Sequence, residues 1–260
     1  MFGWSINLFR VFGIQLAVHA SFGLLLAYWG YQGWQEGGVP GMAYSVALIV
    51  LFFACVILHE LGHSLTARRY GIQVPRILLL PIGGMAEMDR IPRKPGQELL
   101  ITIAGPAVNF VLVAVLLPFT WRTILGLVEV SEYSIPGMLA QLTLANLVMG
   151  IFNLAPVFPM DGGRILRAML ATQLPYLRAT WWAVMVGRGL AVLLIIWALY
   201  VDRLMMAVLF TFILMAGSTE YRLALHREQE EAYWREMARQ AMAAEPPRSD
   251  EPPLLIHGRN

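Results

Sequence analysis

Two histidines and a glutamate lie together in the segment His-Glu-Leu-Gly-His at residues 59–63. On a helix, residues four positions apart share a face, so His59 and His63 can bind one metal ion. The carboxylate of Glu60 would then stand beside a water molecule bound to that metal. Two histidines on a solvated helix would give the same pattern. The segment ends a long apolar run, however, where histidine and glutamate are costly and usually mark a functional site.

Asp161 has the best setting for a third ligand. A hydrolytic zinc site usually has three protein ligands and leaves the fourth position to water. Asp161 lies in the segment NLAPVFPMDGGR at 153–164, whose prolines and glycines predict non-helical backbone at the end of an apolar run. Such backbone is tolerated at membrane depth only where it is buried in protein or lines a wet cavity. The alternative is an aspartate that caps a proline-terminated helix. The other candidates are His19, His226, His257, Glu87, Asp89, Glu98 and the acids of the C-terminal tail.

These residues predict a catalytic metal centre. We expect one Zn²⁺ per chain, bound by His59, His63 and Asp161, because nitrogen and oxygen ligands suit zinc better than Mg²⁺ or Cu(I). Zinc lowers the pKa of a bound water toward about 7 and polarises a carbonyl. Glu60 would take the proton of that water and deliver it to the leaving amine. The implied reaction is hydrolysis of a peptide bond.

The composition predicts that lipid surrounds most of the chain. Of its 260 residues, 58% are hydrophobic and 14% charged, with a mean hydropathy of +0.60. Soluble domains are about 45–50% apolar and about 25% charged, so a soluble globular enzyme is excluded. We expect an all-α polytopic membrane protein with about six transmembrane helices. The apolar stretches long enough for a span of about 20 residues are 18–35, 43–66, 98–120, 138–157, 182–201 and 203–219.

The basic residues predict the orientation of these spans, because cytoplasmic loops carry an excess of Lys and Arg. Arg122 and Arg203 lie in the alternate loops and Arg188 lies within the fifth span; every other Lys and Arg falls on the side that also holds both termini. We therefore expect an integral, multi-pass protein with both termini in the cytoplasm. Its N-terminal residues lack the pattern of a cleaved signal peptide, so Met1 is expected to be the mature start.

Two stretches near the proposed site are not typical of helices. Residues 72–89 contain two prolines and the pair Gly83-Gly84, and residues 5–16 alternate between apolar and polar. Strands and a hairpin fit both better, so we expect a small membrane-associated β-sheet. In residues 5–16, the apolar residues predicted to share one side are Ile6, Leu8, Phe12, Ile14 and Leu16.

The charged C-terminal part is expected to be a separate unit. Glu and Arg recur three and four residues apart over residues 220–244, which predicts a cytoplasmic helix. The Pro-rich and polar end of the chain is typical of disorder. The chain would therefore divide into an intramembrane metalloprotease domain, 1–219, and a cytoplasmic tail, 220–260, that is helical and then disordered.

At these motifs the chain resembles the site-2 protease family, the intramembrane zinc metalloproteases that include the bacterial sporulation-factor processing protease. The matching segments, which together span about residues 5–200, are HELGH at 59–63, NLAPVFPMDGGR at 153–164, PIGG at 81–84, AGPAVN at 104–109 and FRVFGIQLAVHASF at 9–22. The resemblance implies that His59, His63 and Asp161 are zinc ligands and that Glu60 is the catalytic acid and base. It also implies a bacterial cytoplasmic membrane.

The resemblance further implies how a substrate is held. Asn153 would help to position it near the metal, and an edge strand within 77–88, including Gly83 and Gly84, would receive an unwound segment by β-augmentation. Asn153 could instead make a buried hydrogen bond between helices, and the hairpin could be a re-entrant loop that only packs against helices. Asn109 is interpreted as a structural polar residue at a kink.

The expected function is an intramembrane zinc metalloprotease that hydrolyses peptide bonds in or near transmembrane segments. Its partners would be membrane-spanning protein substrates and the lipid bilayer. The alternatives are a polytopic metal-ion carrier and a catalytically inactive membrane scaffold. A carrier is disfavoured because the chain has no internal repeat, and a scaffold because it would not need Glu60. No basic stripe interleaved with aromatic residues occurs, so we expect no nucleic-acid partner.

Overall fold

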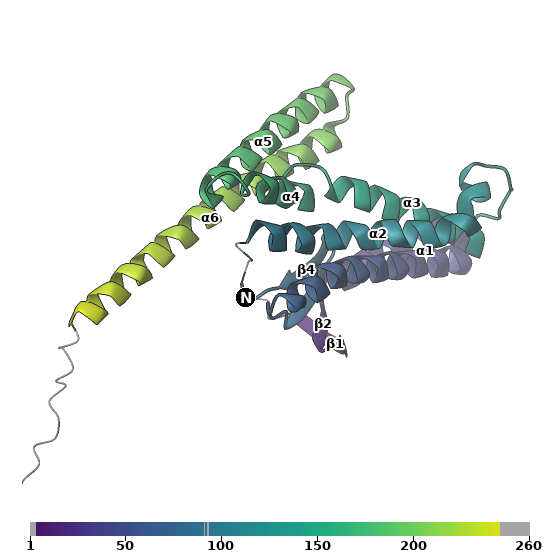
Figure 1. The fold of residues 1–260 in the computed structure, drawn as a ribbon. Coiled ribbons are helices and arrows are strands. Elements are labelled where there is room, and N and C mark those ends of the chain that lie inside the picture. The colour runs from purple at the N-terminus through teal and green to yellow at the C-terminus, as the bar shows by residue number, and fades with distance from the viewer. Residues whose placement is uncertain (1–3, 91, 93, 245–260) are drawn as a thin grey trace, which may run out of the picture.

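The computed structural model describes residues 4–90, 92 and 94–244, and this part of the chain is mainly helical with one small sheet. Helices α1, α2 and α3 lie side by side, α5 and α6 form a second pair, and the short α4 lies between the two groups (Figure 1). The fold expected from the sequence is confirmed. The elements are β1 (Ser5–Val11), β2 (Ile14–His19), α1 (Ser21–Arg69), β3 (Arg76–Leu80), β4 (Gly83–Glu87), α2 (Pro95–Ile124), α3 (Ile135–Asn153), α4 (Asp161–Leu170), α5 (Tyr176–Tyr200) and α6 (Leu204–Ala244).

Five helices of the described chain are long and apolar enough to cross a membrane, namely α1, α2, α3, α5 and α6. Helix α1 accounts for two of the six expected spans, because its backbone is not helical at Gly37 and Gly38. The rings of Phe22 and Phe53 lie 4.7 Å apart, whereas in a straight helix these residues would be about 45 Å apart. The chain therefore reverses at the glycine pair, and α1 consists of two antiparallel limbs.

The sheet has the strand order β1-β2-β3-β4. Strands β1 and β2 are antiparallel, β2 and β3 are parallel, and β3 and β4 form the hairpin expected over residues 72–89. One face of β2 and β3 packs against α1 and α2, where Ile14, Leu16 and Ile77 contact Leu61 and Ile101 in a buried apolar cluster. Strand β4 is left at an edge of the sheet, beside the limb of α1 that carries the HExxH segment.

The structure corrects the prediction that apolar residues of 5–16 share one face. Phe12 and Gly13 both adopt positive φ angles, and they turn the chain back on itself between β1 and β2. Because the turn breaks the alternation, only part of the set faces the core. Ile14 and Leu16 are buried, whereas Ile6, Leu8 and Phe12 are exposed.

Helix α6 runs without a break from Leu204 to Ala244 and projects well beyond the other helices (Figure 1). Residues 220–244 are thus helical, but they continue the last apolar segment rather than starting a separate helix. The boundary between domains at residue 219 stays a prediction. Residues 245–260, expected to be disordered, lie outside the described residues.

Candidate metal centre

The structure brings the three expected ligands together from two helices. His59 and His63 lie on the second limb of α1, and Asp161 is the first residue of α4. The two histidine Nε2 atoms are 3.1 Å apart. Asp161 Oδ2 is 3.3 Å from Nε2 of His59 and 3.2 Å from Nε2 of His63. All three side chains are buried, and they are the group of possible metal ligands found within the described residues.

This triangle of atoms fits a zinc ion. Tetrahedral zinc with ligand bonds of about 2.1 Å holds its ligand atoms about 3.3–3.4 Å apart, close to the three distances found. Asp161 Oδ2 is also buried without a hydrogen-bond partner, as expected of an oxygen that is meant to bind a metal. Two histidines and one carboxylate form the donor set of a hydrolytic zinc site and leave a fourth position for water.

Hydrogen bonds fix both histidine rings with Nε2 toward the site. His59 Nδ1 lies 2.5 Å from Asn109 Oδ1, and His63 Nδ1 lies 2.8 Å from the carbonyl oxygen of Ile101. Both partners are acceptors, so each Nδ1 carries the hydrogen and donates it. Each Nε2 therefore keeps its lone pair for a metal, the arrangement that orients histidine ligands in zinc proteins.

Asn109 is a further candidate site residue, which sequence reasoning missed. It was expected to be a structural polar residue at a kink, but its side chain orients His59 from within α2. Its amide nitrogen donates to Asn146 Oδ1 at 3.0 Å, and Asn146 donates to the Leu142 carbonyl oxygen of α3 at 2.8 Å. The useful signal was its position four residues after Gly105, which places both residues on the face of α2 toward α1.

Two glycines allow α1 and α2 to touch at the metal site. A Cβ atom on Gly105 would overlap the Nε2 and Cε1 atoms of His63 and would lie 2.8 Å from Nε2 of His59. A Cβ atom on Gly62 would lie 2.6 Å from the carbonyl oxygen of Ala104. The second limb of α1, which carries both histidines, can therefore approach α2 closely only because both positions lack a side chain.

The segment before α4 places Asp161. Of the segment 153–164 expected to be non-helical, residues 154–160 are so, whereas Asn153 ends α3 and residues 161–164 begin α4. The non-helical residues fold tightly under the first turn of α4; a Cβ atom on Gly162 would overlap the carbonyl oxygens of Leu154 and Ala155. Its place at the start of α4 favours the negative charge of a carboxylate, so Asp161 offers a carboxylate oxygen.

The predicted catalytic residue Glu60 lies beside strand β4. A Cβ atom on Gly84 would be 2.6 Å from Cγ of Glu60, so the strand backbone packs directly against this side chain. Gly83, the other predicted substrate-binding glycine, has a φ of +141° and open space around it. The edge of the sheet therefore lies next to the predicted acid and base.

Four of the remaining candidates make other interactions. Asn153 donates to the Met149 carbonyl oxygen in its own helix at 3.0 Å, and its role in substrate binding stays a prediction. His19 is hydrogen bonded to Ser21, Asp89 accepts from the backbone of Gln73, and Glu98 is paired with a buried arginine of α4.

Comparisons with known proteins agree with this geometry. The model of peptidase family M50 matches residues 47–126 and 119–194. A zinc metalloprotease of Methanocaldococcus jannaschii is 39% identical over 225 residues, which cover 85% of this chain and 61% of that protein. Stage IV sporulation protein FB of Bacillus subtilis is 30% identical over 170 residues, covering 64% of this chain and 56% of that protein.

A solved structure is also similar. The site-2 protease from Methanocaldococcus jannaschii superposes with a TM-score of 0.58 and 37% identity, covering 84% of this chain and 95% of that one. The chain spans about 60% or less of the length of the curated relatives named above.

Proposed function

Because the chain belongs to peptidase family M50, we propose that this integral, multi-pass membrane protein is an intramembrane zinc metalloprotease. It hydrolyses peptide bonds in or near the transmembrane segments of other membrane proteins. The observation that carries this proposal is the buried triangle of His59, His63 and Asp161 with Glu60 next in sequence to the first ligand.

Each residue of the site has a separate role in the proposed hydrolysis. When bound, zinc supplies a Lewis acid that acidifies a water molecule and polarises the scissile carbonyl. His59, His63 and Asp161 hold the ion, and Asn109 and Ile101 keep the two histidine rings in place. Glu60 accepts the proton from the attacking water and donates it to the leaving amine.

Strand β4 is the proposed binding place for the substrate backbone. A helical substrate shields its own peptide bonds, so it must unwind before hydrolysis, and an extended segment can pair with an exposed sheet edge. Strand β4 is such an edge, and its Gly84 packs against Glu60. Gly83 and Gly84 would let the extended substrate come close to the metal. Asn153, just before the segment that leads to Asp161, would help to orient it.

We propose a bacterial cytoplasmic membrane with both termini in the cytoplasm. The distribution of Lys and Arg supports this orientation, since all but three of these residues fall on one side. The partners are then the lipid bilayer and membrane-spanning protein substrates cut near the cytoplasmic face. The domain comprises residues 1–219, and residues 220–260 form its cytoplasmic tail.

Replacement of Glu60 by glutamine tests the function. The amide cannot take a proton, so we expect hydrolysis to fall by at least about 100-fold, while purified protein keeps one zinc per chain. Activity is measured in lipid vesicles on single-span peptides that carry a fluorophore and a quencher on opposite sides of the span. Glu129→Gln, a change in the exposed segment between α2 and α3, is the control and should leave both readouts unchanged.

Two outcomes would contradict the proposal. Full hydrolysis by Glu60→Gln would remove the assigned acid and base. A wild-type protein that binds zinc, cuts none of the peptides and carries zinc into vesicles would be a transporter.

A further inference from the structure

Arg167 is a buried cation that the proposed hydrolysis does not use. It lies in α4, less than two turns after Asp161, and only 1% of its surface is exposed. A charge so far from solvent is costly unless it is paired. The sequence alone places Arg167 among the basic residues of a cytoplasmic loop. In the structure, α2, α5 and α6 enclose its side chain.

Four groups surround the guanidinium of Arg167. Its Nε and Nη2 atoms donate to Glu98 Oε1 at 2.9 and 2.5 Å, and Nη1 donates to Glu220 Oε1 at 2.8 Å. The rings of Phe158 and Tyr176 lie 5.2 and 5.1 Å from its central carbon, within the range of cation–π contacts. Burial acts to lower the pKa of Arg167, but the facing carboxylate of Glu98 raises it above its ordinary value, so the charge is kept.

These four groups come from four different parts of the chain. Glu98 is on α2, three residues before Ile101, whose carbonyl oxygen accepts from His63. Phe158 belongs to the folded segment that leads into Asp161. Tyr176 begins α5 and Glu220 is on α6. One side chain therefore joins the element that carries Asp161 to the helix that orients His63.

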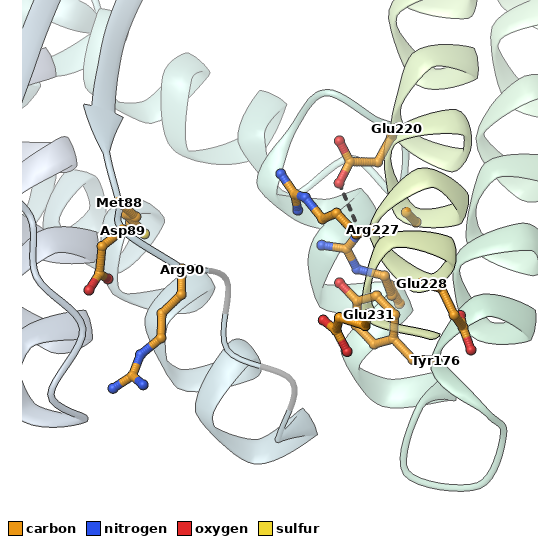
Figure 2. A pocket seen from close by; sticks show the side chains of 10 residues that line it. Met88, Asp89, Arg90, Tyr176, Glu220, Arg227, Glu228 and Glu231 are labelled. Carbon is orange, nitrogen blue, oxygen red and sulfur yellow. Dashed lines mark hydrogen bonds and ion pairs between the residues drawn. The ribbon is translucent and has the colours of Figure 1, made fainter. Parts of the chain in front are cut away.

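Arg167, Tyr176 and Glu220 also line a cavity of about 270 Å³. Figure 2 shows Glu220 and Tyr176 on one side of this cavity and Met88, Asp89 and Arg90, which follow β4, on the other. Glu220 is the more accessible partner, with 27% of its side chain exposed, whereas the side chain of Glu98 is 1% exposed. A change at Glu220 can therefore alter the contacts of Arg167 from the surface.

We propose that Arg167 is a positioning residue that holds Asp161 against His59 and His63. Asp161 and Arg167 share one helix of ten residues, so they move as one rigid body. The two bonds to Glu98 set how far α4 lies along α2, and the contact with Phe158 sets the approach of the preceding segment. Glu220 of α6 also accepts a hydrogen bond from Arg167 and so restrains the position of α4. This inference rests on the metal centre of the proposed function and does not depend on peptide hydrolysis.

Zinc binding by the full chain in detergent tests the proposal. Arg167→Gln removes the charge and the paired bonds to Glu98, so we expect at least about tenfold weaker zinc binding in competition with a chelating dye. Cobalt substituted for zinc should lose its tetrahedral absorption bands. Arg167→Lys keeps the charge and should recover part of the affinity. The matched control is Arg188→Gln, which removes another arginine joined to α6, through Ser218, and should bind zinc like the wild type.

The proposal is overturned if folded Arg167→Gln keeps wild-type zinc affinity and an unchanged cobalt spectrum, or if Arg188→Gln loses affinity equally. If Arg167→Gln does not fold, Glu220→Gln decides: severalfold weaker zinc binding with the fold intact supports the proposal, and unchanged binding overturns it. If the wild-type protein binds zinc, Arg167→Gln weakens that binding and no peptide is cut, only the proposed function is overturned.

Discussion

At the scale of single residues, we expect the hydrogen bond from His59 to Asn109 to determine how tightly zinc is bound. Replacing Asn109 by alanine removes the acceptor 2.5 Å from His59 Nδ1 and frees the ring to turn. We expect zinc affinity to fall by about 10–100-fold, as when other partners of ligating histidines are removed. The measurement is a zinc titration of purified protein against a chelator of known affinity.

Thr120→Val is the control for this change. Thr120 lies within 3.1 Å of Thr143, so it too joins α2 to α3 through buried polar side chains, but without a contact to the ligands. The control should bind zinc normally. Equal affinities for Asn109→Ala and the wild type would show that the ring of His59 is fixed by packing alone.

His59, Glu60 and His63 were predicted from local spacing, because they lie within little more than one helical turn and their geometry follows from their positions in the chain. Asp161 was predicted from the prolines and glycines around it. Two residues that act through tertiary contacts, Asn109 and Arg167, were not predicted. Asn109 acts only because α2 packs beside α1, and Arg167 is buried only because α2, α5 and α6 enclose it. Neither packing is visible in a local pattern of residue types.

At the scale of elements, the contact between α1 and α2 depends on Gly105. In Gly105→Ala the new methyl group would collide with the ring of His63, so the helices must separate or the ring must move. We expect a loss of at least about tenfold in zinc affinity and a destabilisation of about 1–3 kcal/mol, the usual cost of overpacking. Zinc titration and thermal unfolding in detergent measure the two effects.

Gly96→Ala is the matched control, because it adds the same methyl group to the same helix where nothing lies within 4 Å. It should keep zinc affinity and could gain up to about 1 kcal/mol in helix stability. A Gly105→Ala variant with the properties of this control would mean that the helices do not meet as described.

The elements themselves were largely predictable, since apolar length and prolines mark spans and breaks. The turn at Phe12–Gly13 was not predictable, because a bulky residue at positive φ is rare and local residue preferences do not indicate it. That one turn put Ile6 and Leu8 on the exposed strand of a hairpin rather than on the core face of Ile14 and Leu16.

At the scale of the whole molecule, the candidate metal centre joins the helix group α1–α3 to α4. The histidines come from the group α1–α3 and the aspartate from α4, which precedes the pair α5–α6 (Figure 1). Zinc that binds only the folded protein should therefore stabilise it, by about 2.7 kcal/mol at a free concentration 100 times Kd. We expect the Tm to rise by several degrees with added zinc after chelation. His63→Ala should show no such rise, and a zinc-independent wild-type Tm would contradict the bridging site.

The orientation of the entire chain can be tested with cysteine labelling, because its single cysteine, Cys55, is buried. Asn7, Ser131 and Gln229 are exposed positions in β1, between α2 and α3, and in α6. With six spans and cytoplasmic termini, an impermeant maleimide should label Ser131→Cys in intact cells, but Asn7→Cys and Gln229→Cys only after lysis. The inverse pattern would reverse the orientation inferred from Lys and Arg. Labelling of Asn7→Cys and Gln229→Cys from opposite sides would require an odd number of crossings and would contradict the six expected spans.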